Sequence, residues 1–180
     1  MIRISIDESN LKMAENIFSN APQVVHKAAA AAINRTVISL RKTASVTARK
    51  YYVVPASTVK KAIAIKRASG SSGKGAFIAK GTPLRLDTFS LRTPRRGPVR
   101  VKVQKAGGMK PTKNLFIHNS KGPLQRLSSA SYPLRVPYGP SVPQMVGGEE
   151  TLKELTPLAD EILNKRFLHE IEYRYEKGNG

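Results

Sequence analysis

The most restrictive feature of this 180-residue sequence is a stretch of 32 residues, between Pro22 and Pro55, that contains neither glycine nor proline. Pro22 suits the first turn of a helix, where its missing N–H group is not needed. Apolar residues recur through the stretch at spacings of three and four, the pattern of an amphipathic helix buried along one side. They are Val25, Ala29, Ala32, Ile33, Val37, Leu40, Ala44 and Ala48. We expect one helix of roughly 30 residues, about 45 Å long, that serves as a spine for the remaining chain.

Residues 63–136 show a different pattern, made of short apolar segments separated by clusters of glycine, serine and proline. The segment Val99-Arg100-Val101-Lys102-Val103 alternates strictly, so that three valines face one side and two cations the other. Further candidate strands lie at residues 76–79, 84–86 and 115–117. Together these segments predict a meandering antiparallel sheet with one apolar and one polar face.

The two ends of the chain contribute further elements. Residues 1–8 alternate like a strand, and Ser9 is placed to cap a short helix that continues through Phe18. Residues 132–148 contain four prolines, which we expect to exclude a helix and a central strand and to leave an extended arm or a loop of fixed shape. Its apolar residues, Val142 and Met145, suggest that it docks on another surface. From Glu149 to about Tyr175 the pattern is helical, and Pro157 marks either a break or the start of that helix.

The predicted fold class is therefore α+β, with a long amphipathic helix packed on a small antiparallel β-sheet, a Pro/Gly-rich arm and a C-terminal helix. The predicted organisation is an α+β core over residues 1–131, the arm over residues 132–148 and an acidic helix over residues 149–180.

Charge is distributed very unevenly along the chain. The sequence has 31 Lys and Arg against 12 Asp and Glu, a formal net charge of +19. Residues 16–148 hold 24 of these basic residues and one acidic residue, Asp87, whereas residues 149–180 carry a net charge of −3. A segment with so few carboxylates cannot neutralise itself, so a nucleic acid or an acidic neighbouring surface is the expected partner.

Catalytic and metal-binding patterns are not indicated. The chain has no cysteine, which excludes disulfides, thiolate zinc sites and cysteine nucleophiles. The glycines of residues 70–75 lack the spacing of a phosphate-binding loop, and Tyr173 stands where a zinc-protease helix beginning at His169 would need its second histidine. Asp87 has no acidic companion in the middle of the chain for general acid–base chemistry. We expect a binding or structural protein, not an enzyme, without a cofactor or metal.

No apolar run approaches the ~18–20 residues that a membrane-spanning helix requires. The first eight residues also lack the basic start and apolar middle of a signal peptide. We therefore expect no membrane insertion and a soluble protein that stays in the cell that makes it or leaves by another route.

Three motifs occur in a fixed order along the chain. They are Ala-Ile-Asn-Arg-Thr at residues 32–36, Val-Lys-Lys-Ala-Ile at 59–63 continuing to Ile-Lys-Arg-Ala at 65–68, and Tyr-Gly-Pro-Ser-Val-Pro-Gln-Met at 138–145. In order and separation, over roughly residues 20–148, they resemble the minor tail protein Z family, the tail completion proteins of long-tailed bacteriophages and prophages.

The resemblance implies a non-enzymatic virion protein at the head-proximal end of the tail, present in the host cytoplasm during assembly. It implies a homo-oligomeric, sixfold ring stacked with a tail terminator and the head connector, which completes the tail and lines the passage for DNA. It also implies a long helix against a small antiparallel sheet, in agreement with the periodicity described above.

Such a ring would attract the phosphates of non-specific duplex DNA without gripping its bases. The candidates for this role lie in or near loops and are Lys74, Lys80, Arg95, Arg96, Lys105, Lys110 and Lys113. The candidates for contacts with subunits or partners include three cations spaced by seven along one flank of the long helix, together with residues of the arm and the last helix. They are Arg35, Lys42, Arg49, Tyr138, Pro140, Val142, Pro143, Met145, Leu152 and Leu155.

Two other interpretations remain open. One is a free basic nucleic-acid-binding protein of the ribosomal or nucleoid type, and the other is a tail-shaft subunit, which would form long polymers instead of one closed ring. The arm favours an assembly subunit, because a free RNA-binding protein has little use for a segment that clasps neighbours. In an assembly, the acidic last helix and the basic middle of neighbouring subunits would meet head to tail.

Overall fold

The computed structural model describes residues 2–17, 22–69 and 73–178. The chain divides into two compact units, each built from segments that are not consecutive. Unit 1 consists of residues 1–44, 63–79 and 152–180, and unit 2 consists of residues 45–62 and 80–151. This grouping differs from the three consecutive segments expected from the sequence, because the C-terminal helix belongs with the N-terminal segments in unit 1.

The predicted long helix is present as α2 (Pro22–Tyr51), 30 residues in length. Its apolar stripe is buried along its whole length, and Val25, Ala32, Ile33 and Val37 are completely inaccessible to solvent. The absence of glycine and proline after the first residue leaves every later residue able to join the hydrogen-bond ladder of the helix. The prediction of one long amphipathic helix is confirmed.

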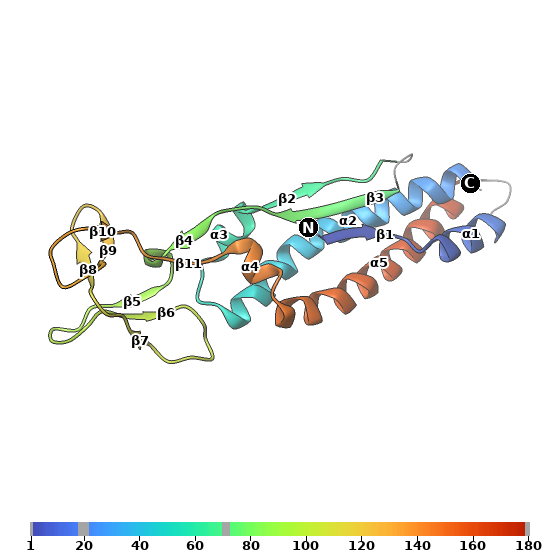
Figure 1. The fold of residues 1–180 in the computed structure, drawn as a ribbon. Coiled ribbons are helices and arrows are strands. Elements are labelled where there is room, and N and C mark those ends of the chain that lie inside the picture. The colour runs from blue at the N-terminus through green and yellow to red at the C-terminus, as the bar shows by residue number, and fades with distance from the viewer. Residues whose placement is uncertain (1, 18–21, 70–72, 179–180) are drawn as a thin grey trace. The chain divides into compact units, whose positions relative to one another are not determined.

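Unit 1 contains a three-stranded antiparallel sheet beside α2 (Figure 1). Its strands are β1 (Ile2–Ser5), β2 (Ile63–Lys66) and β3 (Lys74–Ala79), in the order β1-β3-β2. Central strand β3 lies close against α2, because a Cβ atom built on Gly75 would be 2.6 Å from Cγ2 of Ile33 and 3.2 Å from Cγ2 of Val37. Phe77, two residues further along β3 and so on the same face as Gly75, is buried as well.

Helix α1 (Glu8–Ile17) follows β1, and its cap differs from the prediction. The side chain of Asp7 accepts a hydrogen bond from the backbone N–H of Ser9 at 3.1 Å, and the Asp7 carbonyl accepts one from Leu11 at 3.0 Å. Asp7 therefore occupies the capping position that was expected for Ser9, since an aspartate oxygen reaches the free N–H groups of a first turn equally well. Phe18, expected in this helix, lies outside the described residues.

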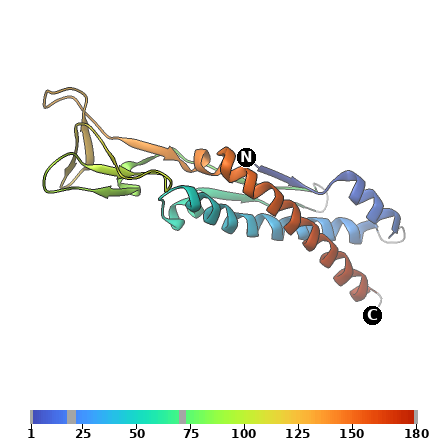
Figure 2. The same cartoon turned by 90° about the horizontal axis from the view of Figure 1, so that it is seen from below.

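The C-terminal helix, α5 (Glu149–Gly178), is 30 residues long and runs without a break through Pro157. Both alternatives predicted for Pro157 are therefore wrong, since the helix begins at Glu149, eight residues earlier, and continues beyond the proline. Its buried contacts include Leu155, Leu163 and Phe167. Figure 2 shows α5 beside α2 in unit 1, where the two helices come close enough to form an ion pair described below.

Unit 2 contains three small antiparallel sheets where one meandering sheet was predicted. The first pairs β4 (Pro83–Arg85) with β11 (Tyr138–Ser141), the second has the order β5-β6-β7, and the third has the order β10-β9-β8. The bounds of the other strands are β5 (Ser90–Arg92), β6 (Arg100–Lys102), β7 (Lys110–Pro111), β8 (Leu115–His118), β9 (Gly122–Arg126) and β10 (Leu134–Arg135). Strands of two to five residues, interrupted by glycine and proline, are too short to extend into one continuous sheet.

Three short helical segments complete unit 2. They are α3 (Ala56–Lys61), the 3-10 helix η1 (Leu86–Thr88) and α4 (Val142–Val146). The α+β class predicted from the sequence is confirmed. Within the described ranges, no helix is both long enough and apolar enough to cross a membrane.

The substitution Gly75→Ala should destabilise the protein by about 1–3 kcal/mol, because the added methyl group forces β3 away from Ile33 and Val37. The measurement is the free energy of unfolding from urea denaturation. Gly108→Ala is the matched control, since nothing lies within 4 Å of its Cβ position, and it should change stability by less than about 1 kcal/mol. Equal effects of the two substitutions would contradict the close β3–α2 packing.

Candidate nucleic-acid interface

Most of the positive charge of the chain belongs to unit 2. Unit 2 contains 17 Lys and Arg against three Asp and Glu, a net charge of +14, whereas unit 1 contains 14 against nine, a net charge of +5. Between residues 80 and 148 the sole acidic residue is Asp87, and its carboxylate already lies 3.2 Å from the guanidinium of Arg85. The other cations of that segment therefore have no carboxylate in the segment left to balance them.

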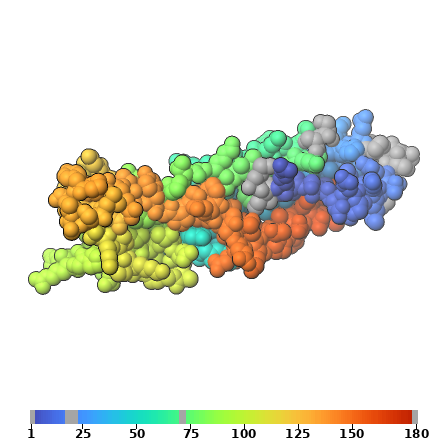
Figure 3. Space-filling view, viewed as in Figure 1, coloured from blue at the N-terminus to red at the C-terminus, as the bar shows by residue number. Residues whose placement is uncertain are grey.

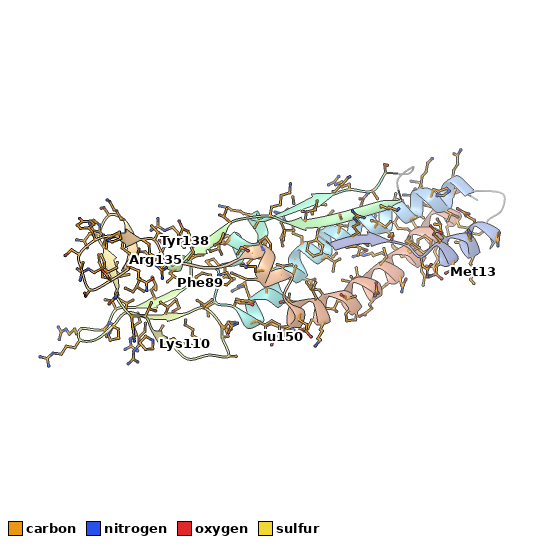
Figure 4. All side chains as sticks on the ribbon, viewed as in Figure 1. Met13, Phe89, Lys110, Arg135, Tyr138 and Glu150 are labelled. Carbon is orange, nitrogen blue, oxygen red and sulfur yellow. The ribbon has the colours of Figure 1, made fainter. Side chains whose placement is uncertain are left out.

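Six of the seven cations predicted to lie near DNA belong to unit 2 and are exposed there. They are Lys80, Arg95, Arg96, Lys105, Lys110 and Lys113. Their side chains make no ion pair or hydrogen bond within the described part of the chain. Lys110 is labelled in Figure 4, among the many side chains that project from the strands and loops of unit 2. Lys74 is exposed at the start of β3, but it belongs to unit 1 and is not part of this group.

The β5-β6-β7 sheet carries further cations that are not among the seven residues predicted to lie near DNA. Arg92 on β5 lies directly opposite Arg100 on β6, and both are exposed. Lys102, two residues further along β6, is on the same face because side chains alternate along a strand. Like charges placed opposite each other on neighbouring strands destabilise a sheet, and in the described residues no carboxylate lies between these two arginines. The sequence signal was the alternation of residues 99–103, which placed Arg100 and Lys102 on one face.

The other face of this sheet borders an apolar groove of about 380 Å³. Val101, Val103 and Lys110 line it, and Tyr52 and Pro140 contribute from other segments of unit 2. Register explains the position of Lys110, because it is paired with Val101 across β6 and β7 and so shares the face of that valine. The cations of the sheet are therefore distributed over both of its faces.

The segment predicted to be an extended arm or a loop of fixed shape contains a strand and a short helix, so the expectation that its prolines exclude a helix is wrong. Residues 138–141 form β11, and the next five residues form α4. Ser141 and Gln144 form a capping box in which the Gln144 side chain accepts a hydrogen bond from the Ser141 N–H at 2.8 Å and the Ser141 side chain accepts one from the Gln144 N–H at 3.4 Å. Pro143 lies in the first turn of α4, where its lack of an N–H group costs nothing.

The residues of this segment that were predicted to contact neighbouring molecules differ in their exposure. Val142 and Met145 are 1% and 0% exposed, so the expectation that they contact another molecule is wrong. Pro140 and Pro143 are half-buried, and Tyr138 is exposed. Figure 4 labels Tyr138 and Phe89, and the ring of Phe89 lies so close to Gly139 that a Cβ atom there would be 2.6 Å from it.

The predicted contact residues of the two long helices are divided in the same way. Leu155 is buried in its own chain and Leu152 is half-buried, which removes Leu155 from the candidates for contact with a partner. Lys42 and Arg49 are exposed on α2. Arg35, by contrast, has a partner in its own chain and is described next.

Arg35 forms an ion pair with the buried carboxylate of Glu170 on α5. Nη1 of Arg35 lies 2.7 Å from Oε1 of Glu170, whose side chain is only 3% exposed, and Nη2 of Arg174 lies 3.6 Å from the other oxygen. The angles at Oε1 do not meet the geometry of a hydrogen bond, so the contact acts mainly through charge. Arg35 thus neutralises a buried acid of its own chain, while its side chain stays 52% exposed, and its predicted contact with a partner stays a prediction.

Two of the three sequence motifs meet inside unit 1. The side-chain amide of Asn34 donates a hydrogen bond to the Ala68 carbonyl at 3.0 Å, and its oxygen accepts one from the Ala68 N–H at 2.8 Å. Asn34 belongs to the motif at residues 32–36 and Ala68 ends the motif at residues 65–68. These motif residues therefore serve to attach the segment after β2 to α2.

Among the described residues there is no group of three or more His, Asp and Glu that could hold a metal ion. Comparison of the chain with protein-family models, curated proteins and solved structures found no match.

The substitution Arg35→Ala should lower the free energy of unfolding by about 1–3 kcal/mol, because it leaves the Glu170 carboxylate buried with only the more distant Arg174. Lys42→Ala is the matched control on the same flank of α2, and its exposed side chain predicts a change within about 0.5 kcal/mol. Urea denaturation measures both values. A loss no larger for Arg35→Ala than for the control would argue against the ion pair.

Proposed function

We propose that this protein is a structural, non-enzymatic subunit at the head-proximal end of the tail of a long-tailed phage or prophage, where unit 2 contacts the backbone of duplex DNA. The observation that carries the DNA contact is the unbalanced charge of unit 2, and above all the opposed pair Arg92 and Arg100. The assignment to a phage tail rests on the resemblance of the three motifs to the minor tail protein Z family.

Phosphate groups are the ligand that this surface suits best. A phosphate between two guanidinium groups converts their repulsion into two charge-assisted hydrogen-bonding contacts. Cations that project from loops and short strands can follow a DNA backbone without reading bases, and each contact releases counterions from the DNA. The chain has no tryptophan and 11 other aromatic residues, six Tyr and five Phe, so it is poor in stacking platforms for unpaired bases. These features favour sequence-independent contact with a duplex that has to slide.

On this proposal the subunit belongs to a homo-oligomeric ring, sixfold as the resemblance implies, stacked between a tail terminator and the head connector. Unit 2 would supply the cations that line the DNA passage. The protein would be found in the host cytoplasm during assembly and in the virion afterwards.

One observation favours the second candidate, a free basic nucleic-acid-binding protein. The arm that distinguished an assembly subunit from a free binder is folded into β11 and α4, with Val142 and Met145 buried. Because these residues are already buried within their own chain, they no longer support a contact with a neighbouring subunit. The two candidates share the DNA contact and differ in whether the protein is part of a particle.

The double substitution Arg92→Gln and Arg100→Gln should change stability and DNA affinity in opposite directions. Removing the like-charge pair should raise the free energy of unfolding by about 0.2–1 kcal/mol. Loss of two phosphate contacts should weaken binding of a random-sequence duplex and reduce the slope of log K against log salt by up to about 0.9 per contact. Urea denaturation and fluorescence anisotropy at several salt concentrations measure the two effects.

The matched control is Lys27→Gln with Lys66→Gln, two exposed cations of unit 1 whose removal changes the net charge equally. This control should leave most of the affinity intact. Equal losses of affinity in both double variants would mean that DNA responds only to total charge, and the assignment of the contact to unit 2 would fail.

Immunogold labelling of assembled particles separates the candidate functions. We expect label at one point, where tail and head meet. Label along the whole tail would favour a shaft subunit, and an absence of particle-bound label, with DNA binding retained, would favour the free nucleic-acid-binding protein.

A further inference from the structure

Helices α1 and α5 form an open groove of about 520 Å³ in unit 1. Its lining is mostly apolar and includes Met13 and Ala14 from α1 and Phe167, Leu168 and Ile171 from α5. Met13 is 64% exposed and Leu168 is 62% exposed. In Figure 3 the two helices lie side by side at the surface, and Figure 4 labels Met13 on α1. Large apolar side chains gathered at an open groove are typical of a surface that binds another molecule.

The groove lies between the two net-acidic helices of the chain. Together α1 and the part of α5 in unit 1 contain eight Asp and Glu against six Lys and Arg, a net charge of −2 in a chain of net charge +19. One of these acids, Glu170, is already paired with Arg35. Glu172 lines the groove, and no cation pairs with its carboxylate in the described part of the chain. The surroundings therefore favour an occupant that combines apolar side chains with positive charge.

The hairpin formed by β9 and β10 in unit 2 has this combination. Next to the ends of its strands, Leu127 is 55% exposed and Tyr132 is 76% exposed. Arg126 and Arg135 flank these two residues on either side. Arg126 lies over the ring of Phe116, 5.2 Å from its centroid, and Arg135 donates two hydrogen bonds to the Gln125 side chain.

These contacts leave both charges of the hairpin without a carboxylate among the described residues. The connecting loop is itself ordered by hydrogen bonds, since Leu127 N–H donates to the Pro133 carbonyl at 3.3 Å and Ala130 N–H donates to the Ser128 side chain at 3.2 Å. Less conformational entropy is lost when a segment that is already ordered binds.

We propose that the groove between α1 and α5 of one copy receives the β9–β10 hairpin tip of a second copy of this chain. Tyr132 and Leu127 enter the apolar groove, and Arg126 and Arg135 face the acidic helices that border it. Each copy carries one groove and one tip, so the contact is heterologous and joins copies head to tail. The inference rests on the proposed function in that it names a contact between subunits of the proposed ring. It is tested without DNA, so its failure would leave the DNA contact of unit 2 untouched.

The test uses two single variants of the full chain, Leu168→Asp in the groove and Tyr132→Asp in the hairpin tip. Sedimentation velocity without DNA should show concentration-dependent association of the natural chain and at least a tenfold weaker association of each variant. Both residues are more than half exposed, and circular dichroism with thermal unfolding verifies that the variants are folded. Val46→Asp, at an exposed apolar residue outside both surfaces, should associate like the natural chain.

Mixing the two variants gives the decisive result. The Leu168→Asp chain keeps an intact tip and the Tyr132→Asp chain keeps an intact groove, so the mixture should form a 1:1 dimer that grows no further. A natural chain that stays monomeric would overturn the proposal and leave the groove to a different protein. Association of the natural chain without a dimer in the mixture would also overturn it, because the contact would then join like surfaces.

Cross-linking gives a second measurement that does not depend on the aspartate variants. Because the sequence has no cysteine, single cysteines react without competition. A Met13→Cys chain mixed with a Tyr132→Cys chain should form a disulfide dimer several times faster than either chain alone or either chain mixed with Val46→Cys. Equal rates in all mixtures would overturn the contact.

Discussion

The close approach of β3 to α2 is the contact on which unit 1 depends. Gly75 brings the strand backbone against Ile33 and Val37, and no larger residue fits that space without displacing them. Because β3 is the central strand, β1 and β2 pair with it on either side and take their positions from it. The Asn34–Ala68 hydrogen bonds then hold the segment that follows β2 against the same helix. The short distance between β3 and α2 that Gly75 allows therefore determines the positions of β1, β2 and β3.

Unit 2 is organised by a different constraint, because its strands are short and its charges repel one another. Its sheets bury few apolar residues, among them Val101 in the β5-β6-β7 sheet and Leu115 and Leu124 in the β10-β9-β8 sheet. Arg92 and Arg100 face each other without a carboxylate among the described residues. An arrangement of this kind lowers the stability of the free protein and raises its affinity for an anion by the same interaction. Opposed arginines without a neighbouring carboxylate suit a phosphate-binding surface, and a purely structural sheet would not benefit from them.

The elements that depend on local sequence pattern could be predicted from the sequence, whereas contacts between residues distant in the sequence could not. The long helix followed from periodicity and the lack of glycine and proline. Helix α4 was missed because four nearby prolines were taken to exclude any helix, although Ser141, Pro143 and Gln144 have the spacing of a capping box with proline in the first turn. The pairing of Arg35 with Glu170 joins residues 135 positions apart, so no spacing rule reveals it. Spacing rules do not reveal the division into small sheets either, because β4 and β11 pair across more than 50 residues of sequence.

The positive charge of unit 2 also bears on how copies of the chain would meet. Two copies with net charges of +19 repel each other, and contact between their basic units would make that repulsion strongest. A contact through α1 and α5 uses the acidic part of the chain instead and leaves most of the cations of unit 2 free. On the proposed function, DNA bound to those cations would neutralise the charge that opposes association, so binding of DNA and association of copies would favour each other. By thermodynamic linkage such a coupling would be reciprocal: assembled copies would bind DNA more tightly, and DNA would promote assembly. A subunit built in this way would form its most stable assembly around the polymer that it encloses.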